Sequence, residues 1–229
     1  MKSSAKASGG TRGRVLESAC EVFAEKGYRD ATIADICERA KANIASVNYH
    51  FGDKESLYAA AWHDAFRASL ATYPPDGGVP DDAPPAQRLR ARILAILSRI
   101  ADPHCREFAV VAREMGDPTG LLEEAIREAI DPLREAMSGI VRELLGPAAD
   151  QARVGLCLTS IIGQCFHWLF TQWHLRHLPD SGRFGGIPHV GPDNVEQLAD
   201  HITQFSLAGI RAMREQAEAT AAAAGETKP

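Results

Sequence analysis

The chain has 229 residues, of which 45% are hydrophobic and 24% charged, with a formal net charge of −5. This length suits a small domain and one larger domain, and the apolar content is ample for a core in each. No apolar run is long and uncharged enough to span a membrane, so we expect no membrane partner. The five cysteines form no C-x-x-C pair, which favours buried thiols in a cytoplasmic, reducing compartment over a disulfide framework.

The first segment, residues 1–11, is basic and rich in small residues but has no apolar stretch behind it. We therefore expect a disordered arm and not a secretory signal. An amphipathic helix follows, and Gly27 is placed to end it. Its apolar face consists of Val15, Ala19, Cys20, Val22 and Phe23.

The stretch from Thr32 to Phe51 predicts two short helices joined by a tight turn. Thr32 is placed to cap the first helix, with Asp35 as its capping-box partner, and Asn43 to cap the second. In the second helix Val47 and Phe51 share one face, which leaves small, amide and phenol side chains on the other. Such a helix suits the major groove of DNA, so the pattern predicts a helix-turn-helix.

The rest of the chain also shows helical periodicity, and no strand pattern or internal repeat is present. Asp53 is placed to cap a fourth helix, whose buried stripe includes Leu57, Tyr58, Trp62 and Phe66. A Pro/Gly/Asp linker at 74–85 comes next. Further helices are expected at about 86–101, 105–115, 119–145, 149–176 and 194–219. Thr119 is placed to cap the third of these, and Pro132 should kink that helix or mark its division.

The run F-A-E-K-G-Y-R-D-A-T-I-A-D-I-C-E-R-A from Phe23 to Ala40, followed by N-I-A-S-V-N-Y-H-F-G-D-K-E-S-L-Y from Asn43 to Tyr58, resembles the N-terminal domain of TetR/AcrR-family transcriptional regulators. The N-I-A-x-x-N-Y-H-F-G helix is similar to a subgroup with a shared C-terminal domain, as is R-E-M-G-D-P-T from Arg113 to Thr119. In one departure, Lys41 occupies the turn where the family usually has Gly. A positive φ there would cost Lys about 1 kcal/mol or more.

The resemblance implies an all-α fold, with a three-helix helix-turn-helix domain at 12–58 and a larger helical domain at 59–220 for ligand binding and dimerisation. Residues 221–229 are expected to form a disordered tail.

Within residues 1–67 there are 10 Lys and Arg against 9 Asp and Glu, so the acidic excess lies in the later part of the chain. DNA affinity needs only a local cationic face, and we expect it to depend on dimerisation.

The expected DNA contacts divide by chemistry. Ile44 and Ala45 begin the recognition helix and are placed to meet thymine methyl groups, and Asn48, one turn later, can hydrogen-bond an adenine edge. Other positions match family residues that contact phosphates. The full expected interface consists of Thr32, Asn43, Ile44, Ala45, Ser46, Asn48, Tyr49, His50 and Lys54, although His50 has packing within the domain as an alternative role.

By resemblance, an unknown small-molecule effector would bind inside the C-terminal helices and change the separation of the two DNA-binding domains. Candidate lining residues are Phe108, Arg113, Glu114, Gln164, Trp168 and Thr171, with an ordinary core or surface role as the alternative for each. His167, His174 and His177, with Cys165 nearby, raise a metal-responsive regulator as a weaker alternative. The sequence predicts no cofactor and no resident metal.

The helix expected at 149–176 is apolar around more than one face, as its residues Leu158, Ile161, Ile162, Phe166 and Leu169 illustrate. Such a helix is buried on two sides, which favours a homodimer over a larger monomeric core. No P-loop, zinc-protease, nucleophile-elbow or dinucleotide motif is present, so nothing supports a helical enzyme. We therefore predict a ligand-responsive repressor that binds a palindromic double-stranded operator as a dimer.

Overall fold

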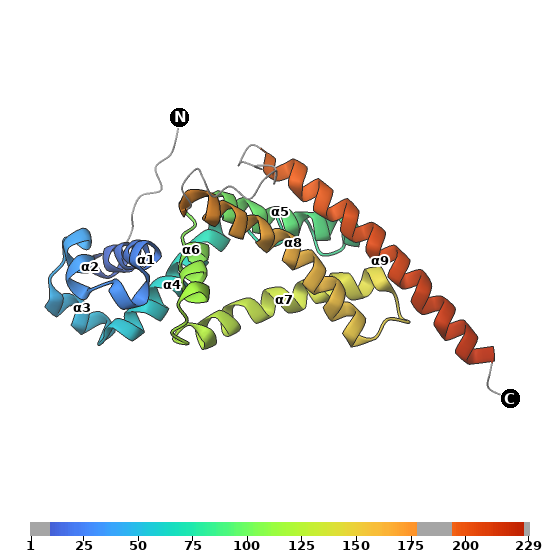
Figure 1. Ribbon diagram of the computed structural model, residues 1–229, viewed down its shortest axis with the longest axis horizontal. Coiled ribbons are helices and arrows are strands. Elements are labelled where there is room, and N and C mark those ends of the chain that lie inside the picture. The colour runs from blue at the N-terminus through green and yellow to red at the C-terminus, as the bar shows by residue number, and fades with distance from the viewer. Residues whose placement is uncertain (1–9, 178–193, 227–229) are drawn as a thin grey trace. The chain divides into compact units, whose positions relative to one another are not determined.

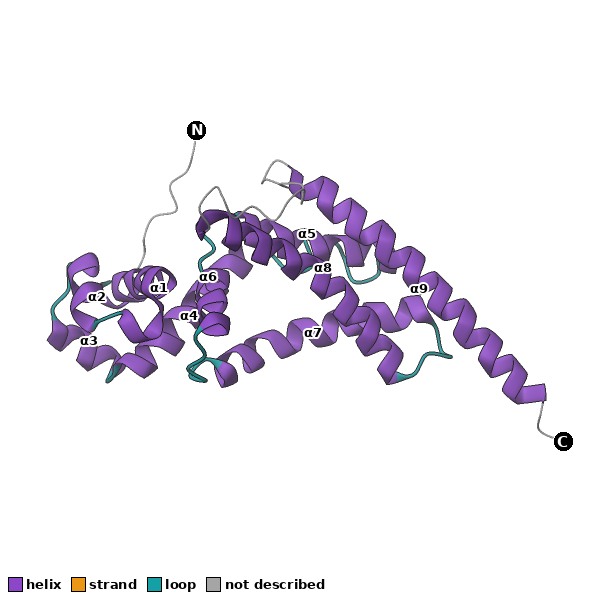
Figure 2. Ribbon diagram, in the orientation of Figure 1, coloured by secondary structure: helices purple, strands orange, loops and turns teal. Residues whose placement is uncertain are grey.

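The computed structural model describes residues 10–177 and 194–226, and within these residues every regular element is a helix (Figures 1 and 2). The predicted all-α fold is therefore confirmed. The helices are α1 (Thr11–Asp30), α2 (Ile33–Ala40), α3 (Ile44–Phe51), α4 (Lys54–Thr72), α5 (Pro85–Ala101), α6 (Glu107–Gly116), α7 (Glu123–Leu145), α8 (Gln151–His177) and α9 (Val195–Glu226).

The chain divides into two compact units. Unit 1 consists of residues 1–72 and 103–129, and unit 2 of residues 73–102 and 130–229. Unit 1 thus combines α1 to α4 with α6, which comes much later in the chain. The predicted domain boundaries at residues 58 and 59 follow chain order, and they stay a prediction.

Unit 1 is built around α1, which packs against α2, α3, α4 and α6. The apolar face predicted for α1 is buried, and it meets the buried stripe of α4. The ring of Phe23 lies edge-on to that of Tyr58, with centroids 4.7 Å apart, and Trp62 stacks on Phe66 at 5.2 Å. Burial of aromatic side chains contributes much of the hydrophobic free energy that stabilises a small unit.

Local sequence signals fix the ends of the first helices as predicted. Gly27 has a φ of 76°, which interrupts the regular helix before the last residues of α1. Thr32 and Asp35 form the predicted capping box on α2. The turn residue Lys41 has φ 50° and ψ 47°. This is the left-handed conformation, which favours glycine. Gly52, with φ 78°, ends α3.

In unit 2, α5 packs against α8 and α9, and α8 packs against α9. The side chains of Leu89, Ile93 and Leu97 on α5 are completely buried. On α8, Val154, Ile161 and Cys165 are also buried. Ion pairs from Arg88 to Glu143 and from Arg90 to Asp200 connect α5 with α7 and with α9.

Several predicted boundaries differ from the structure. Thr119 does not cap the long helix, because Gly120 adopts a φ of 76° and α7 begins only at Glu123. The helix α7 continues through Pro132 and is not divided there. The helix α1 begins at Thr11, the last residue of the expected arm, and α9 continues to Glu226 although its end was predicted near 219. The arm residues 1–9 and the last residues 227–229 lie outside the described residues.

Candidate nucleic-acid interface

The helix α3 presents one face to solvent and one to the core of unit 1. Val47 is 1% exposed, whereas Ile44 is 53% and Tyr49 85% exposed. Ala45, Asn48 and His50 are exposed as well, so the predicted packing alternative for His50 finds no support in its burial. A solvent-facing helix with methyl, amide and phenol groups carries the donors, acceptors and apolar surface that base edges and phosphates require.

The two short helices begin at side chains that cap them. The Thr32 hydroxyl oxygen accepts a bond from the Asp35 amide at 3.1 Å, and the Asn43 side-chain oxygen accepts one from the Ser46 amide at 2.7 Å. Each cap therefore uses an acceptor atom. The Asn43 amide group remains able to donate to a phosphate at a helix N-terminus, where the helix dipole also favours an anion.

The acidic residue of the capping box has a specific electrostatic environment. Lys26 lies 2.9 Å from the Asp35 carboxylate, and the backbone amide of Thr32 donates to the same carboxylate at 3.1 Å. The hydrogen bond from Lys26, followed by those from Thr32, lowers the pKa of Asp35 to about 2. Asp35 is therefore ionised near neutral pH and holds the start of α2 in place.

Two cations on other helices lie near the recognition helix. The Arg12 guanidinium lies 5.3 Å from the centre of the Phe51 ring, at the last residue of α3. The Lys54 ammonium lies 4.4 Å from the centre of the Tyr28 ring and donates to the Arg29 carbonyl oxygen at 3.4 Å. Partial burial lowers the pKa of Lys54, with the charge of Asp30 opposing that shift. The predicted phosphate contact Lys54 is thus also in contact with the end of α1.

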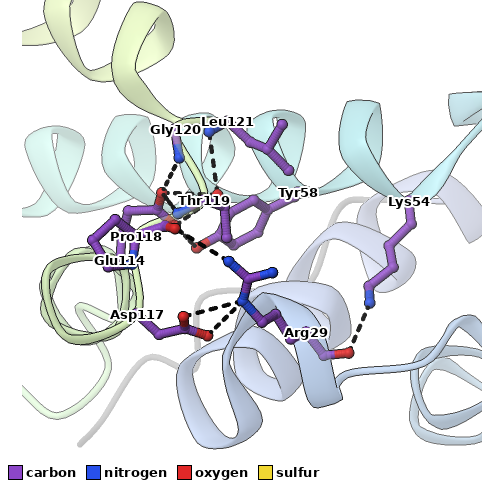
Figure 3. Close-up of polar contacts among 9 residues, drawn as sticks. All are labelled: Arg29, Lys54, Tyr58, Glu114, Asp117, Pro118, Thr119, Gly120 and Leu121. Atoms are coloured by element: carbon purple, nitrogen blue, oxygen red, sulfur yellow. Dashed lines mark hydrogen bonds and ion pairs between the residues drawn. The ribbon is translucent and has the colours of Figure 1, made fainter.

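The last turn of α6 and the residues that follow it are hydrogen-bonded to α1 and α4 (Figure 3). We call residues 113–120 the corner. The Glu114 carboxylate accepts bonds from the amides of Thr119 at 2.7 Å and Gly120 at 2.8 Å, and from the Thr119 hydroxyl at 2.8 and 3.0 Å. Its second oxygen also accepts a bond from the Tyr58 hydroxyl on α4 at 3.1 Å. Both oxygens of Glu114 are therefore used within unit 1.

Arginines connect the corner to α1. The Arg113 side chain donates to the carbonyl oxygens of Ala24 at 3.2 Å and Glu25 at 2.6 Å. In the opposite direction, the Arg29 side chain donates to both oxygens of Asp117, at 3.0 and 2.9 Å, and to the Pro118 carbonyl at 3.3 Å. No local pattern predicts the hydrogen bonds between Arg29 and Asp117, because the two residues are 88 positions apart.

The predicted effector residues belong to different helices. Phe108, Arg113 and Glu114 are on α6 in unit 1, whereas Gln164 and Trp168 are on α8 in unit 2. Phe108 and Trp168 are buried. Gln164 donates to the Ser160 carbonyl at 3.1 Å and to the Ser206 hydroxyl at 3.5 Å. The side chains of Thr171, His174 and His177 lie outside the described residues, so the structure does not place them.

Two family models match the chain. Residues 15–61 match the model described as "Bacterial regulatory proteins, tetR family", and residues 85–210 match "HTH-type transcriptional dual regulator CecR, C-terminal domain". The first match contains α2 and α3 with the exposed face described above. The second covers more than half of the chain.

Individual proteins show the same relationship. The HTH-type transcriptional regulator SrpR of Pseudomonas putida is 25% identical over 154 residues, which cover 67% of this chain and 68% of SrpR. The HTH-type transcriptional repressor AcnR of Corynebacterium glutamicum is 41% identical over 58 residues, 25% of this chain and 31% of AcnR.

Among solved structures, the transcriptional regulator FadR from Bacillus subtilis, in complex with stearoyl-CoA, has the same fold. The TM-score is 0.65 at 18% identity, and the alignment covers 86% of this chain and 97% of that chain. Together with the solvent-facing α3 and the two matching models, these similarities lead to one conclusion. The chain belongs to the tetR family of bacterial DNA-binding transcriptional regulators, and its C-terminal region is a domain of the CecR type.

Proposed function

We propose that this protein is a ligand-responsive repressor that binds a palindromic operator as a homodimer in the cytoplasm. The observation that carries the proposal is the exposed face of α3, supported from behind by the buried Val47. Repression is supported by the 41% identity of the DNA-binding region to the repressor AcnR. A dimer is supported by the symmetry argument that two α3 helices must reach successive major grooves about one helical turn apart.

We assign the base contacts to Ile44, Ala45 and Asn48, all exposed on α3. The phosphate contacts are assigned to Thr32, Asn43, Ser46, Tyr49, His50 and Lys54. Arg12 is an additional phosphate contact in this proposal, because its guanidinium lies beside the end of α3. The recognition-helix subgroup to which N-I-A-S-V-N-Y-H-F-G is similar stays a prediction.

The dimer surface in this proposal lies on α8 and α9. Leu156 on α8 is 70% exposed, and Phe205 on α9 is 65% exposed. Gly163 and Gly209 are also exposed, and a Cβ added at either glycine would meet no atom within 4 Å. Large apolar side chains next to small residues allow helices of a second subunit to approach closely.

The effector in this proposal is a small molecule with apolar character. The FadR structure contains stearoyl-CoA, a ligand with a long apolar chain. Within unit 2, the buried Trp168 on α8 supplies apolar surface, and Gln164 on the same helix remains a polar candidate. We remove Arg113 and Glu114 from the proposed ligand contacts, because their hydrogen bonds are made within unit 1.

A gel-shift experiment with the DNA upstream of the protein's own coding sequence tests the proposed function. At low salt, the dimer is expected to retard this DNA at concentrations that leave a scrambled fragment of equal length free. A folded dimer that binds neither fragment, or both equally, would contradict sequence-specific operator binding. The metal-responsive alternative predicts that a chelator abolishes the shift and that added zinc restores it.

A further inference from the structure

The corner, residues 113–120, is hydrogen-bonded to α1 and α4, two of the helices that pack against the recognition helix α3. Glu114 accepts from Tyr58 on α4, and Arg113 donates to carbonyls in the last regular turn of α1. Arg29, at the end of α1, holds Asp117 and Pro118 (Figure 3). All these contacts lie inside unit 1, so they describe one connected network.

We propose that four residues position the recognition helix for operator reading, namely Glu114, Arg113, Tyr58 and Arg29. Their hydrogen bonds hold the corner and the DNA-binding helices together as one rigid unit. The inference rests on the proposed dimeric operator binding. Two half-sites are read together only when each α3 is held in one orientation within its subunit. A corner that separates from α1 and α4 would let that orientation vary, and operator binding would then have to restore it.

The Glu114 carboxylate is the centre of this network. Its acceptors are occupied by two backbone amides and two hydroxyl groups, and one of these hydroxyls belongs to a residue that is 1% exposed, Tyr58. Without Glu114 the buried Tyr58 hydroxyl would lose this acceptor, and the corner amides would lose theirs as well. Bonds to an ionised acceptor are stronger than neutral ones, so the network depends on the charge of Glu114.

The contacts to α1 reinforce the same connection. Helical carbonyl groups at a C-terminus lack partners within the helix and carry partial negative charge, which the Arg113 guanidinium complements. The exposed bond between Arg29 and Asp117 is weaker by itself, because solvent screens it. Its position matters more: the Arg29 carbonyl accepts from Lys54, a proposed phosphate contact. A phosphate that draws Lys54 therefore acts on the residue that holds the corner.

The test compares three variants of the full-length protein at a temperature well below their unfolding transitions. Glu114→Ala removes the centre of the network, and Tyr58→Phe removes a single hydroxyl. The matched control is Glu124→Ala, which removes the same charge from the same unit at an exposed residue of α7 that pairs with Arg127. Each variant is titrated with operator DNA and with scrambled DNA of equal length.

We expect Glu114→Ala to raise the Kd for operator DNA about 3- to 10-fold relative to Glu124→Ala, with Tyr58→Phe raising it less. The Kd for scrambled DNA should be the same in Glu114→Ala and Glu124→Ala, because both lose one negative charge. A merely unfolded fraction would weaken binding to both DNAs equally, so the ratio of the two constants separates positioning from stability.

Amide hydrogen exchange supplies a second readout on the same proteins. In Glu114→Ala, exchange should accelerate in residues 115–122 and also in residues 24–31 at the end of α1. Acceleration in the corner alone, with an unchanged operator Kd, would overturn the inference while leaving the proposed function intact. If the wild-type protein itself fails to distinguish operator from scrambled DNA, the proposed function fails instead. If Glu114→Ala does not fold, Tyr58→Phe decides: an operator Kd equal to that of the wild type overturns the inference.

Discussion

Asn48 lies on the exposed face of α3, one helical turn after the Asn43 cap. Its amide can both accept from and donate to an adenine edge in the major groove, whereas alanine can do neither. We expect Asn48→Ala to weaken operator binding by about 1–3 kcal/mol while binding to unrelated DNA is unchanged. Titrations of both DNAs at one salt concentration measure this. An equal loss on both would show that Asn48 contacts the backbone and not a base.

Lys41 is the one non-glycine residue with a positive φ among the described residues. A side chain in the left-handed region costs about 1–2 kcal/mol, and glycine avoids this cost but loses more entropy on folding. We therefore expect Lys41→Gly to raise the free energy of unfolding by about 0.5–1 kcal/mol. Lys41→Ala keeps the strain and serves as the control. Thermal or urea unfolding of the three proteins distinguishes them, and a destabilised Lys41→Gly would contradict the strain argument.

Single-residue signals were informative where the interaction is local. The caps at Thr32 and Asn43 and the helix end at Gly27 are confirmed, because each depends on residues within one turn of the chain. The predicted helix cap at Thr119 is wrong, because it depends on local sequence alone. A threonine before an apolar run is typical of a cap, but its hydroxyl is used by Glu114, and Gly120 turns the backbone away from a helix.

At the level of elements, the start of α2 carries a pH-dependent contribution to stability. Asp35 has a pKa of about 2 in the folded protein against an ordinary value of 3.8, chiefly because Lys26 and Thr32 hydrogen-bond to it. A lowered folded pKa means that the stabilisation is complete above pH 4 or so and is lost as the pH falls toward about 2.

We therefore expect the difference in unfolding free energy between the wild type and Asp35→Asn to be constant near neutral pH and to shrink steadily between about pH 4 and pH 2. Unfolding curves of both proteins at several acidic pH values measure it. Glu38→Gln, at an exposed position of the same helix, is the control for the general effect of removing a carboxylate. A difference that stays constant down to pH 2 would show that the ionised form of Asp35 does not stabilise the fold.

The helix-turn-helix was readable from the sequence because its periodicity, caps and turn all lie within residues 32–52. The position of α6 was not. Its helical period predicts an apolar face of Phe108, Val111 and Met115, but only Phe108 of these is buried and Met115 is 56% exposed. Periodicity also does not say which helices cover the buried face. The partners of Arg113 are 88 and 89 positions away, and no local pattern encodes such a distance. The prediction of Arg113 and Glu114 as ligand contacts takes no account of these partners.

For the whole molecule, the order of residues along the chain does not match the division into two units. Residues 103–129 come after the linker and α5, yet they belong to unit 1 with the DNA-binding helices. The helix α6 therefore lies in the same unit as the recognition helix α3. In the described part of the chain, none of the helices combines the length and apolar character that crossing a membrane requires.

The proposed dimer yields the last prediction, because the exposed apolar residues Leu156 and Phe205 need cover. A charged side chain within an apolar interface is costly to desolvate, so Leu156→Asp combined with Phe205→Asp should dissociate the protein into subunits. The control is Ala68→Asp combined with Ala71→Asp, which adds the same two charges at exposed residues of α4, outside both the proposed dimer surface and the corner. Sedimentation at micromolar concentration should show one subunit for the double variant and two for the control.

DNA titration of the same proteins connects assembly to function. A single subunit reads one half-site, so the double variant should lose most of its preference for operator over scrambled DNA, while the control should retain it. A double variant that remains a dimer would place the interface elsewhere than on α8 and α9. A monomer that binds the whole operator as tightly as the wild type would show that one recognition helix is sufficient, and the argument from two-fold symmetry would then be wrong.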